Sequence, residues 1–372
     1  MIFKQRCQAK ISKSALLNNY NAIKKFSKSE VMAVVKANAY GHDALLCAKL
    51  LEETGASYLA VTSIDEAIYL RENGVVMPVL VLGPTPVEFA KNLVFHNLTQ
   101  TVVDLDYAKK LSEELANCEV SLKVHIKVDS GMGRLGLVFQ KSRDLPVTVN
   151  QVIEIYSLES LVPEGIFTHL SSADGEDESD VEFTKEQFKL FESLAKSLSE
   201  SGIDFKYCHI SNSAGVANYP SKVFNMVRPG LSLYGYTSAA RNIGLQPVLT
   251  LSGEVSSLKN LPKGTPISYN RTYILPSDCT VATISAGYAD GVNRALSNLG
   301  SVMIGGKKCP ILGRVCMDYI MVDVTDCAVN IGDQAFIICD EIDACEHAKM
   351  ANTIEYEILC NISARVPRLL VE

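Results

Sequence analysis

The sequence predicts an α/β fold in which an N-terminal (β/α)8 barrel of the TIM type, residues 1–236, precedes a mostly antiparallel β domain, residues 237–372. Three observations support this prediction. Eight short apolar runs alternate with segments of helical period in the first part of the chain. After about residue 237, short strands separated by turn residues replace that pattern. The 372 residues also exceed what one hydrophobic core usually supports.

The predicted barrel strands are rich in β-branched and other apolar residues. They are residues 31–35, 58–61, 79–82, 101–103, 122–128, 165–168, 207–210 and 224–227. Amphipathic segments lie between several of them, as in residues 183–201, where apolar side chains recur at helical spacing. An open doubly wound sheet is the alternative, but no Gly-x-Gly-x-x-Gly follows the first strand.

The second part of the chain alternates strands with Gly, Pro, Asn and Asp turns, as in residues 261–264. Its predicted strands are residues 248–255, 280–284, 302–304, 319–324 and 334–338. Helical period is nearly absent until the last segment. This pattern is typical of an antiparallel sheet that forms a separate domain.

Composition narrows the class of protein. A hydrophobic content of 47% with 21% charged residues indicates a globular chain. The net charge of −7 and the absence of a basic run argue against a nucleic-acid partner. The N-terminus lacks the apolar core of a signal peptide, and the apolar runs are too short to span a membrane. We therefore expect a cytoplasmic protein without a membrane partner.

Cysteine spacing gives a further expectation. The chain has 11 cysteines, and no two of them stand in a Cys-x-x-Cys pair. This pattern indicates neither a structural metal site nor a disulfide framework, so we expect no metal and a reducing compartment.

Lys36 is the most informative single residue. It lies in the string VVKANAYGH, residues 34–42, where an apolar run gives way to a polar turn. Partial desolvation at the end of a buried strand disfavours the ammonium form and leaves the amine nucleophilic. A Schiff-base lysine that holds pyridoxal 5'-phosphate (PLP) needs this property. A lone strand-end lysine that extends into solvent is the simpler alternative.

Polar residues follow several predicted strands at the rim where parallel barrels carry their chemistry. They are Lys36 after the first strand, Lys127 and Arg134 at the fifth, His169 at the sixth, His209, Asn212 and Ser213 at the seventh, and Arg228 and Gly230 at the eighth. A hydroxyl and a glycine-opened backbone after the last two strands suit a phosphate monoester. Each residue alone could be a core histidine or a structural ion-pair partner. Because all of them are predicted at the same rim of the barrel, we expect them to form one functional site.

The chain resembles the alanine racemases over essentially its whole length. The resemblance rests on VVKANAYGH, on KVDSGMGRLG at 127–136, on FTHL at 167–170, on HISNSA at 209–214 and on VRPGL at 227–231. In the second part it rests on PISYN at 266–270, GYADG at 287–291, GRVCMD at 313–318 and YEI at 356–358. It implies a PLP-dependent enzyme that interconverts L-alanine and D-alanine.

The resemblance also implies roles for the barrel residues. Lys36 would bind PLP covalently, and Arg228, supported by His209, would face the pyridine nitrogen. A permanent guanidinium cation keeps that nitrogen neutral, which favours reversible proton exchange over transamination. The remaining cofactor-binding residues implied by the resemblance are Tyr40, His169, Asn212, Ser213, Gly230, Leu231 and Tyr356.

Substrate contacts follow from the same likeness. Arg134 would bind the region of the substrate carboxylate and the phenolic oxygen of PLP, a task that suits a fork-shaped donor. Lys127 matches a position that is carbamylated in many relatives. Carbamylation would replace a like-charge contact between Lys127 and Arg134 with an attractive one.

Racemisation needs a second base on the opposite face of Cα. By the resemblance this base is Tyr269, supplied by the neighbouring subunit of a head-to-tail homodimer together with the turn Cys316, Met317 and Asp318. Met317 would contact the substrate. Lys36 would exchange the proton of D-alanine and Tyr269 that of L-alanine. The residues implied for the entry path are Tyr288, Asp174, Arg294, Arg314 and Ile354.

One position departs from the family pattern. Many members carry glycine after the catalytic tyrosine, and this chain has Asn270. Asparagine adopts left-handed backbone angles more readily than other non-glycine residues, so we expect the turn to survive.

Several alternatives remain open at this point. Barrel-type amino-acid decarboxylases share a similar lysine string, but they use an acidic residue at the pyridine nitrogen and a Gly-Gly-Gly phosphate loop, whereas this chain offers Arg228. A serine or broader-specificity racemase is closer, although the Tyr356 ring should limit side-chain size. A non-catalytic PLP carrier would lack the β domain. The sequence therefore favours an alanine racemase that supplies D-alanine for peptidoglycan, the biological role being implied by the family alone.

Overall fold

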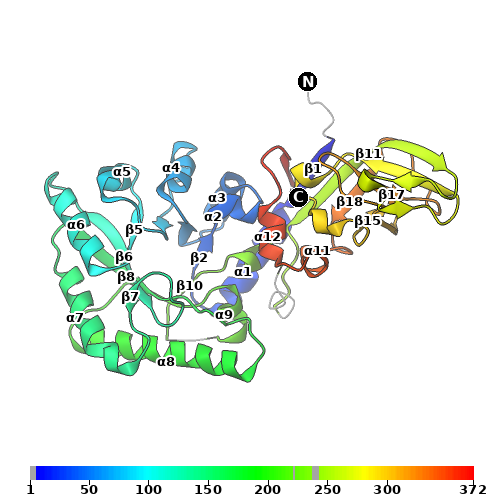
Figure 1. Ribbon diagram of the computed structural model, residues 1–372. Coiled ribbons are helices and arrows are strands. Elements are labelled where there is room, and N and C mark those ends of the chain that lie inside the picture. The colour runs from blue at the N-terminus through cyan, green and yellow to red at the C-terminus, as the bar shows by residue number, and fades with distance from the viewer. Residues whose placement is uncertain (1–5, 221–222, 237–242) are drawn as a thin grey trace.

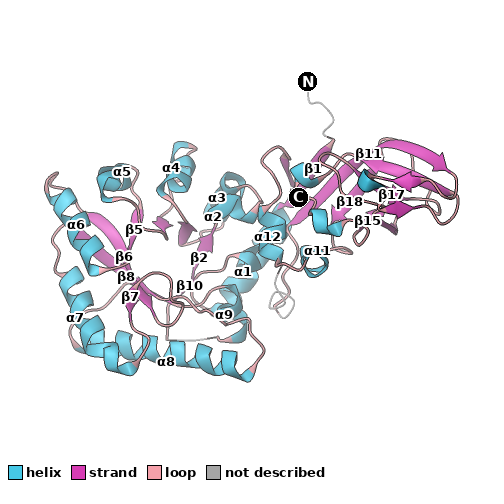
Figure 2. Ribbon diagram, in the orientation of Figure 1, coloured by secondary structure: helices cyan, strands magenta, loops and turns pink. Residues whose placement is uncertain are grey.

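The computed structural model describes residues 6–220, 223–236 and 243–372. A ring of strands surrounded by helices occupies one part of the molecule, and a twisted β domain lies beside it (Figure 1). Figure 2 shows that helices dominate the first part and strands the second. Among the described residues, no helix combines the length and the apolar character needed to cross a membrane.

Eight parallel strands close into a barrel in the first part. They are β2 (Glu30–Val34), β3 (Tyr58–Val61), β4 (Val79–Val81), β5 (Thr99–Val102), β6 (Leu122–Asp129), β8 (Leu161–Phe167), β9 (Tyr207–His209) and β10 (Met226–Val227). Neighbours pair in the order β5-β4-β3-β2-β10-β9-β8-β6, and pairing of β5 with β6 closes the ring. This closure confirms the predicted barrel and excludes an open doubly wound sheet.

Helices join the barrel strands and cover their outer face. They are α1 (Lys13–Ser27), α3 (Ala44–Glu53), α4 (Ile64–Glu72), α5 (Ala90–Phe95), α6 (Leu105–Ala116), α7 (Leu145–Tyr156), α8 (Glu178–Glu200) and α9 (Ser213–Asn218). Side chains at the N-caps of α1, α3, α4, α6 and α9 accept backbone N–H groups, as such positions require. The predicted helix at 183–201 lies almost entirely within α8.

The β domain is mostly antiparallel, as predicted. Its main strands are β11 (Leu249–Leu261), β14 (Cys279–Ile284), β15 (Ser301–Ile304), β16 (Lys307–Pro310), β17 (Ile320–Asp323) and β18 (Gln334–Ile338). The short hairpin of β12 (Pro266–Ile267) and β13 (Tyr273–Ile274) projects from it. Two helices, α11 (Ala344–Ala351) and α12 (Glu355–Cys360), follow the last of these main strands.

Both ends of the chain contribute to the β domain. Strand β1 (Cys7–Ser12) pairs antiparallel with β11 and parallel with β19 (Arg368–Val371). The predicted division into 1–236 and 237–372 assigned β1 to the barrel, whereas its hydrogen-bonded neighbours belong to the second part. The boundary itself falls at residues 237–242, outside the described residues, and remains a prediction.

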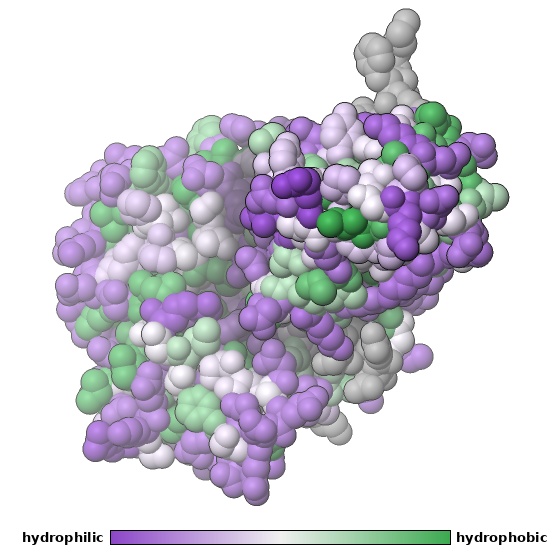
Figure 3. Space-filling model, turned by 45° about the vertical axis from the view of Figure 1, so that its right-hand side comes forward, coloured by the Kyte–Doolittle hydropathy of each residue, from purple (hydrophilic) through white to green (hydrophobic). Residues whose placement is uncertain are grey.

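The two parts meet beside the barrel rim. Helix α12 packs against α2 (Lys36–Tyr40), which follows the first barrel strand. Figure 3 shows a hollow between the barrel and the β domain on one face, with mainly hydrophilic side chains around it. Helix α12, near the C-terminus, therefore lies beside the barrel rim that carries Lys36.

Candidate active site

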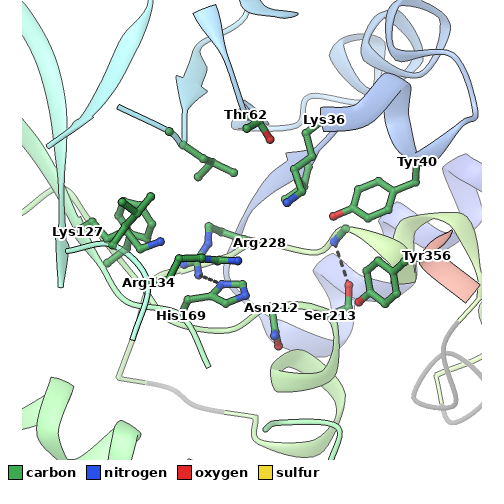
Figure 4. A pocket seen from close by; sticks show the side chains of 16 residues that line it. Lys36, Tyr40, Thr62, Lys127, Arg134, His169, Asn212, Ser213, Arg228 and Tyr356 are labelled. Carbon is green, nitrogen blue, oxygen red and sulfur yellow. Dashed lines mark hydrogen bonds between the residues drawn. The ribbon is translucent and has the colours of Figure 1, made fainter. Parts of the chain in front are cut away.

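A cavity of about 320 Å³ lies at the C-terminal ends of the barrel strands. It is lined by Val34, Lys36, Tyr40, Thr62, Leu82, Gly83, Lys127, Arg134, Leu135, Phe167, His169, Asn212, Ser213, Arg228, Gly230 and Tyr356. Figure 4 shows the Lys36 amine pointing into this space between the arginine side and the tyrosine side. The structure thus brings together most of the barrel residues predicted from the sequence.

Lys36 projects from a turn of unusual backbone conformation. The four residues 37–40 have φ between 50° and 54°, which makes a short left-handed helical turn without glycine. Such angles cost about 1–2 kcal/mol per residue for L-amino acids. The ring Nδ1 of buried His42 lies 3.0 Å from the carbonyl oxygens of both Ala39 and Tyr40, and a protonated Nδ1 donates to them. The surroundings therefore stabilise a conformation that the local sequence does not favour.

Glu66 binds this turn from the next β/α unit, a contact that was not predicted from the sequence. Its Oε1 accepts the N–H of Ala37 over 2.7 Å, and its Oε2 accepts the N–H of Thr62 over 2.7 Å. Ser63 and Glu66 stand at the spacing of a capping box at the start of α4. That signal would have predicted a local capping role, but not the contact across to Ala37.

Positive charge and burial together make the lysines of the cavity easier to deprotonate. Burial, followed by the Arg134 guanidinium, lowers the pKa of Lys36, while Glu66 opposes this shift. Burial and Arg134 likewise lower the pKa of Lys127 to about 8. Both amines therefore lose their protons more readily than an exposed lysine.

Arg134 reaches the cavity from the loop after β6. Asp129, at the end of that strand, accepts the N–H groups of Gly131 and Gly133, each over 3.0 Å. These two contacts fix the path of the glycine-containing loop. Arg134 consequently extends into the cavity beside His169 (Figure 4).

Arg228 lies at the base of the cavity, and its side chain is buried and hydrogen-bonded. Its NH1 lies 2.8 Å from His209 Nδ1, and its NH2 donates to the carbonyl oxygen of Thr168 over 2.7 Å. Because a guanidinium can only donate, His209 Nδ1 is the acceptor and its Nε2 carries the proton. Burial, followed by the Arg228 charge, holds the pKa of His209 well below its usual range, so the ring is neutral.

The contacts of His209 continue into the barrel interior, through residues that were not predicted from the sequence. His209 Nε2 lies 2.9 Å from His125 Nδ1, and His125 Nε2 lies 3.7 Å from the Glu164 carboxylate. The His209 ring also stacks on Phe167 with centroids 4.7 Å apart. A row of polar groups therefore leads from Arg228 into the core. Motif spacing gave no signal for it, because the contacts join residues from different strands.

Hydroxyl groups gather at the opposite end of the cavity. Ser213 Oγ accepts the N–H groups of Gly230 and Ser232, over 3.0 and 3.1 Å. The rings of Tyr40 and Tyr356 lie 5.8 Å apart, on the same side (Figure 4). A Cβ atom at residue 230 would come within 2.4 Å of the Tyr40 hydroxyl oxygen, so any larger residue there would displace the Tyr40 ring. This end of the cavity can receive a phosphate group.

The other predicted cofactor residues take different positions around the cavity. The Asn212 side chain caps α9 by accepting the N–H of Gly215 over 2.9 Å. His169 Nδ1 lies 3.3 Å from Arg228 NH2, and burial followed by that cation holds its pKa well below the usual range. Leu231 is fully buried behind Gly230 and is not among the residues that line the cavity.

Tyr356 lines the Lys36 cavity, but the other predicted residues of the β domain, Tyr269, Tyr288, Cys316, Met317 and Asp318, are not among the residues that line it. Tyr269 is 68% exposed and Met317 is 52% exposed. Tyr269 and Cys316 instead line a separate surface groove of about 570 Å³. Tyr288 is also exposed, and Asp318 forms an ion pair with Arg365 over 2.8 Å.

Asn270 adopts the left-handed conformation expected of it, with φ 59° and ψ 12°. The neighbouring Ser268 donates its hydroxyl to the Arg314 carbonyl oxygen over 2.7 Å. The turn that carries Tyr269 therefore forms without glycine.

In the ranges that the structure describes, no group of three or more His, Cys, Asp and Glu side chains could hold a metal ion.

A closed parallel barrel with a lysine at its rim, joined to an antiparallel β domain, defines a barrel-type two-domain enzyme. Family models show which one: residues 11–238 match the alanine racemase N-terminal domain, and residues 248–370 match the alanine racemase C-terminal domain. The chain belongs to the alanine racemase family.

Similar proteins cover nearly the whole chain. The alanine racemase of Carboxydothermus hydrogenoformans is 40% identical over 98% of this chain and 99% of its own length. That of Clostridium perfringens strain SM101 is 41% identical over 97% of this chain and 94% of its own. The solved alanine racemase of Clostridium difficile 630 has a TM-score of 0.92 and 35% identity, covering 100% and 97%. The Bacillus anthracis alanine racemase with bound L-Ala-P has a TM-score of 0.88 and 35% identity, covering 100% and 96%.

Proposed function

We propose that this protein interconverts L-alanine and D-alanine with PLP as its cofactor. The observation that carries the proposal is the position of Lys36. Its amine lies in one cavity between the Arg228 side and the hydroxyl groups of Tyr40, Ser213 and Tyr356. Membership of the alanine racemase family supports the same activity.

The residues present fit PLP. Tyr40, Ser213 and Tyr356 would hold its phosphate, beside the backbone that Gly230 leaves open. Lys36 would bind its aldehyde covalently, and Arg228 would face its ring nitrogen. Asn212 and His169 would complete the surroundings of the cofactor, and Leu231 would contribute from behind Gly230. When bound, PLP makes the Cα proton of an amino acid more acidic.

Arg228 directs this chemistry toward proton exchange. It keeps its proton at neutral pH, although burial lowers its pKa to about 9. Its N–H groups donate to His209 and to the Thr168 carbonyl. A cation that only donates hydrogen bonds favours an unprotonated ring nitrogen, whereas a carboxylate would stabilise a protonated one. A neutral ring withdraws electron density from Cα less strongly than a protonated one. This property favours reversible removal and return of the Cα proton.

Lys36 would remove or return the proton on the face of Cα that serves D-alanine. Burial and the Arg134 charge lower its pKa, which makes the amine a more available base than an exposed lysine. Arg134 would bind the substrate carboxylate region, and Lys127, as a carbamate, would orient Arg134. A carbamate would turn a like-charge contact into an attractive one.

Tyr269 lies exposed on the β domain and does not line the Lys36 cavity, which supports a second base supplied by another chain. We propose a head-to-tail homodimer in which Tyr269 of the partner subunit exchanges the proton of L-alanine. Met317 of the partner subunit would contact the substrate, within a turn that Cys316 and Asp318 shape. Tyr288 would line the entry path.

Serine or a broader set of amino acids is the nearest alternative substrate class. Tyr356 lines the cavity, and its bulky ring should limit the size of the substrate side chain near Cα, which favours alanine. D-Alanine for peptidoglycan and a cytoplasmic location are the corresponding biological proposals. An amino-acid decarboxylase is less consistent with Arg228 at the base of the cavity.

Proton NMR of the PLP-loaded protein with L-alanine in deuterated water tests the proposal. The Cα–H signal should disappear while D-alanine accumulates and no carbon dioxide forms. Release of carbon dioxide would establish a decarboxylase instead. Exchange with serine at higher kcat/KM than with alanine would overturn the substrate assignment.

A further inference from the structure

We propose that Glu66 is a positioning residue for Lys36, acting through the backbone of the turn from which Lys36 projects. This inference rests on the proposed role of Lys36 as the cofactor-binding base. Glu66 itself does not line the cavity. It acts at Ala37, the residue next to Lys36.

The two oxygens of Glu66 join two adjacent barrel loops. Oε1 accepts from Ala37 after β2, and Oε2 accepts from Thr62 after β3, each over 2.7 Å. Thr62 is itself a cavity-lining residue. Hydrogen bonds to an ionised carboxylate are about twice as strong as neutral ones. One side chain therefore fixes the separation of two loops that border the Lys36 amine.

The turn needs such support because residues 37–40 are all left-handed and none is glycine. The far end of the turn is held by His42, and Asn38 Oδ1 accepts the N–H of Ala44 over 2.8 Å. Glu66 holds the near end, where a shift of the backbone would move Lys36 directly. Misplacement of a reacting group by about 1 Å can cost about a hundredfold in rate.

Charge gives Glu66 a second effect on the same lysine. Its carboxylate raises the pKa of Lys36, against the lowering by burial and by Arg134. Removing the charge should therefore make the Lys36 amine still easier to deprotonate.

Three variants separate geometry from charge. Glu66→Gln removes the charge and one acceptor, while Glu66→Asp keeps the charge but shortens the reach to the two amides. Glu72→Gln, at the exposed end of the same helix, is the matched control. The readout is acetylation of Lys36 against pH, measured by peptide mass spectrometry on protein freed of PLP, together with kcat for alanine on the PLP-loaded enzyme.

We expect Glu66→Gln to shift the midpoint of Lys36 acetylation to lower pH and to reduce kcat by about ten- to a hundredfold. Glu66→Asp should lose rate with a smaller shift of the midpoint. If both Glu66 variants match Glu72→Gln in midpoint and kcat, the inference is wrong, even if they melt at lower temperature. Borohydride reduction that labels another lysine would instead refute the proposed role of Lys36, and the acetylation midpoint would still report on Glu66.

We also infer, from an independent observation, that Cys309 and Cys327 form an oxidisable dithiol. Their sulfur atoms lie 3.3 Å apart although the residues are 18 positions apart in sequence. Cys309 is buried on β16, and Cys327 is partly exposed in the loop after β17. A bond between them would close a ring around β17 and the turn that carries Met317.

Hydrogen peroxide is the class of oxidant that balances the step. The Cys327 sulfur attacks one peroxide oxygen to give a sulfenic acid and one water. The Cys309 sulfur then attacks Cys327 and releases the second water, so two thiols lose two protons and two electrons. Burial raises the pKa of the Cys309 thiol to about 12, which leaves the partly exposed Cys327 to react first.

Peroxide treatment of the PLP-loaded protein, followed by non-reducing peptide mapping, tests the pair. We expect a Cys309–Cys327 cross-link that dithiothreitol reverses and that Cys309→Ser and Cys327→Ser each abolish. Cys118→Ser, on the barrel, should leave it intact. Conversion of Cys327 to a sulfinic acid while Cys309 stays a free thiol would overturn the inference, as would pairing of either cysteine elsewhere.

Discussion

The Arg228 guanidinium donates a hydrogen bond to His209 Nδ1 over 2.8 Å, and His209 in turn meets His125 over 2.9 Å. Because Arg228 can only donate, His209 Nδ1 must accept, so His209 is neutral and carries its proton on Nε2. The cation at the base of the cavity is therefore oriented by a buried ring that cannot take up a proton without losing this contact.

Replacement of His209 by leucine should weaken both the fold and the reaction. It leaves an N–H group of Arg228 buried without its acceptor, at a cost of about 1–3 kcal/mol in the free energy of unfolding. Urea unfolding measures that loss, and kcat for alanine should fall with it. His96→Ala, at the surface end of α5, is the control. An unchanged kcat in His209→Leu would show that Arg228 is oriented without His209.

Lys36→Ala should abolish covalent attachment of PLP. The amine supplies the bond to the cofactor aldehyde, and alanine offers no substitute. The absorbance of the PLP-loaded protein near the edge of the visible range and borohydride trapping both measure the attachment. Lys123→Ala, on the outside of β6, is the control. Stoichiometric trapping in Lys36→Ala would place the attachment at another lysine.

Mixing two inactive variants tests whether the site spans two chains. Lys36→Ala lacks one base and Tyr269→Ala the other, so a mixed dimer would contain one intact site. We expect partial recovery of alanine racemisation once subunits exchange, as verified by native mass spectrometry. Absence of recovery despite proven exchange would argue that each site lies within one chain.

Lys127 should make stability depend on pH. Its pKa in the folded protein, about 8, lies below the ordinary 10.5. Between these values the unfolded chain holds a proton that the folded chain has released, so the free energy of unfolding should rise with pH across this window. Urea unfolding at several pH values measures the slope, and Lys127→Met should reduce it. An equal slope in Lys127→Met would assign the effect to other groups.

Carbamylation of Lys127 should follow the same titration, because carbon dioxide reacts with the neutral amine. Carbon-13 NMR with labelled bicarbonate should show a carbamate signal that Lys127→Met removes. A signal that survives in Lys127→Met would place the carbamate on a different amine.

Much of the barrel could be predicted because its strands are locally encoded. Runs such as residues 58–61 and 122–128 are apolar and β-branched, and they are bounded by turns, so each indicates a strand without knowledge of its neighbours. The parallel arrangement then brings their ends to one rim, where Lys36, Arg134 and Arg228 were expected and where they are found. The pairing of β1 with β11 and β19 had no comparable signal, because it joins residues far apart in sequence.

The sequence by itself determined the succession of strands and helices and the residue types at the barrel rim, because these depend on local pattern and on known motifs. The tertiary structure decided the backbone conformation around Lys36 and the direction in which the pKa of its amine is shifted. The left-handed turn at 37–40, the Glu66 contact to Ala37 and the neutral His209 all depend on groups from separate strands. Such contacts arise when the closed ring buries polar side chains together, where each must find a partner from another element.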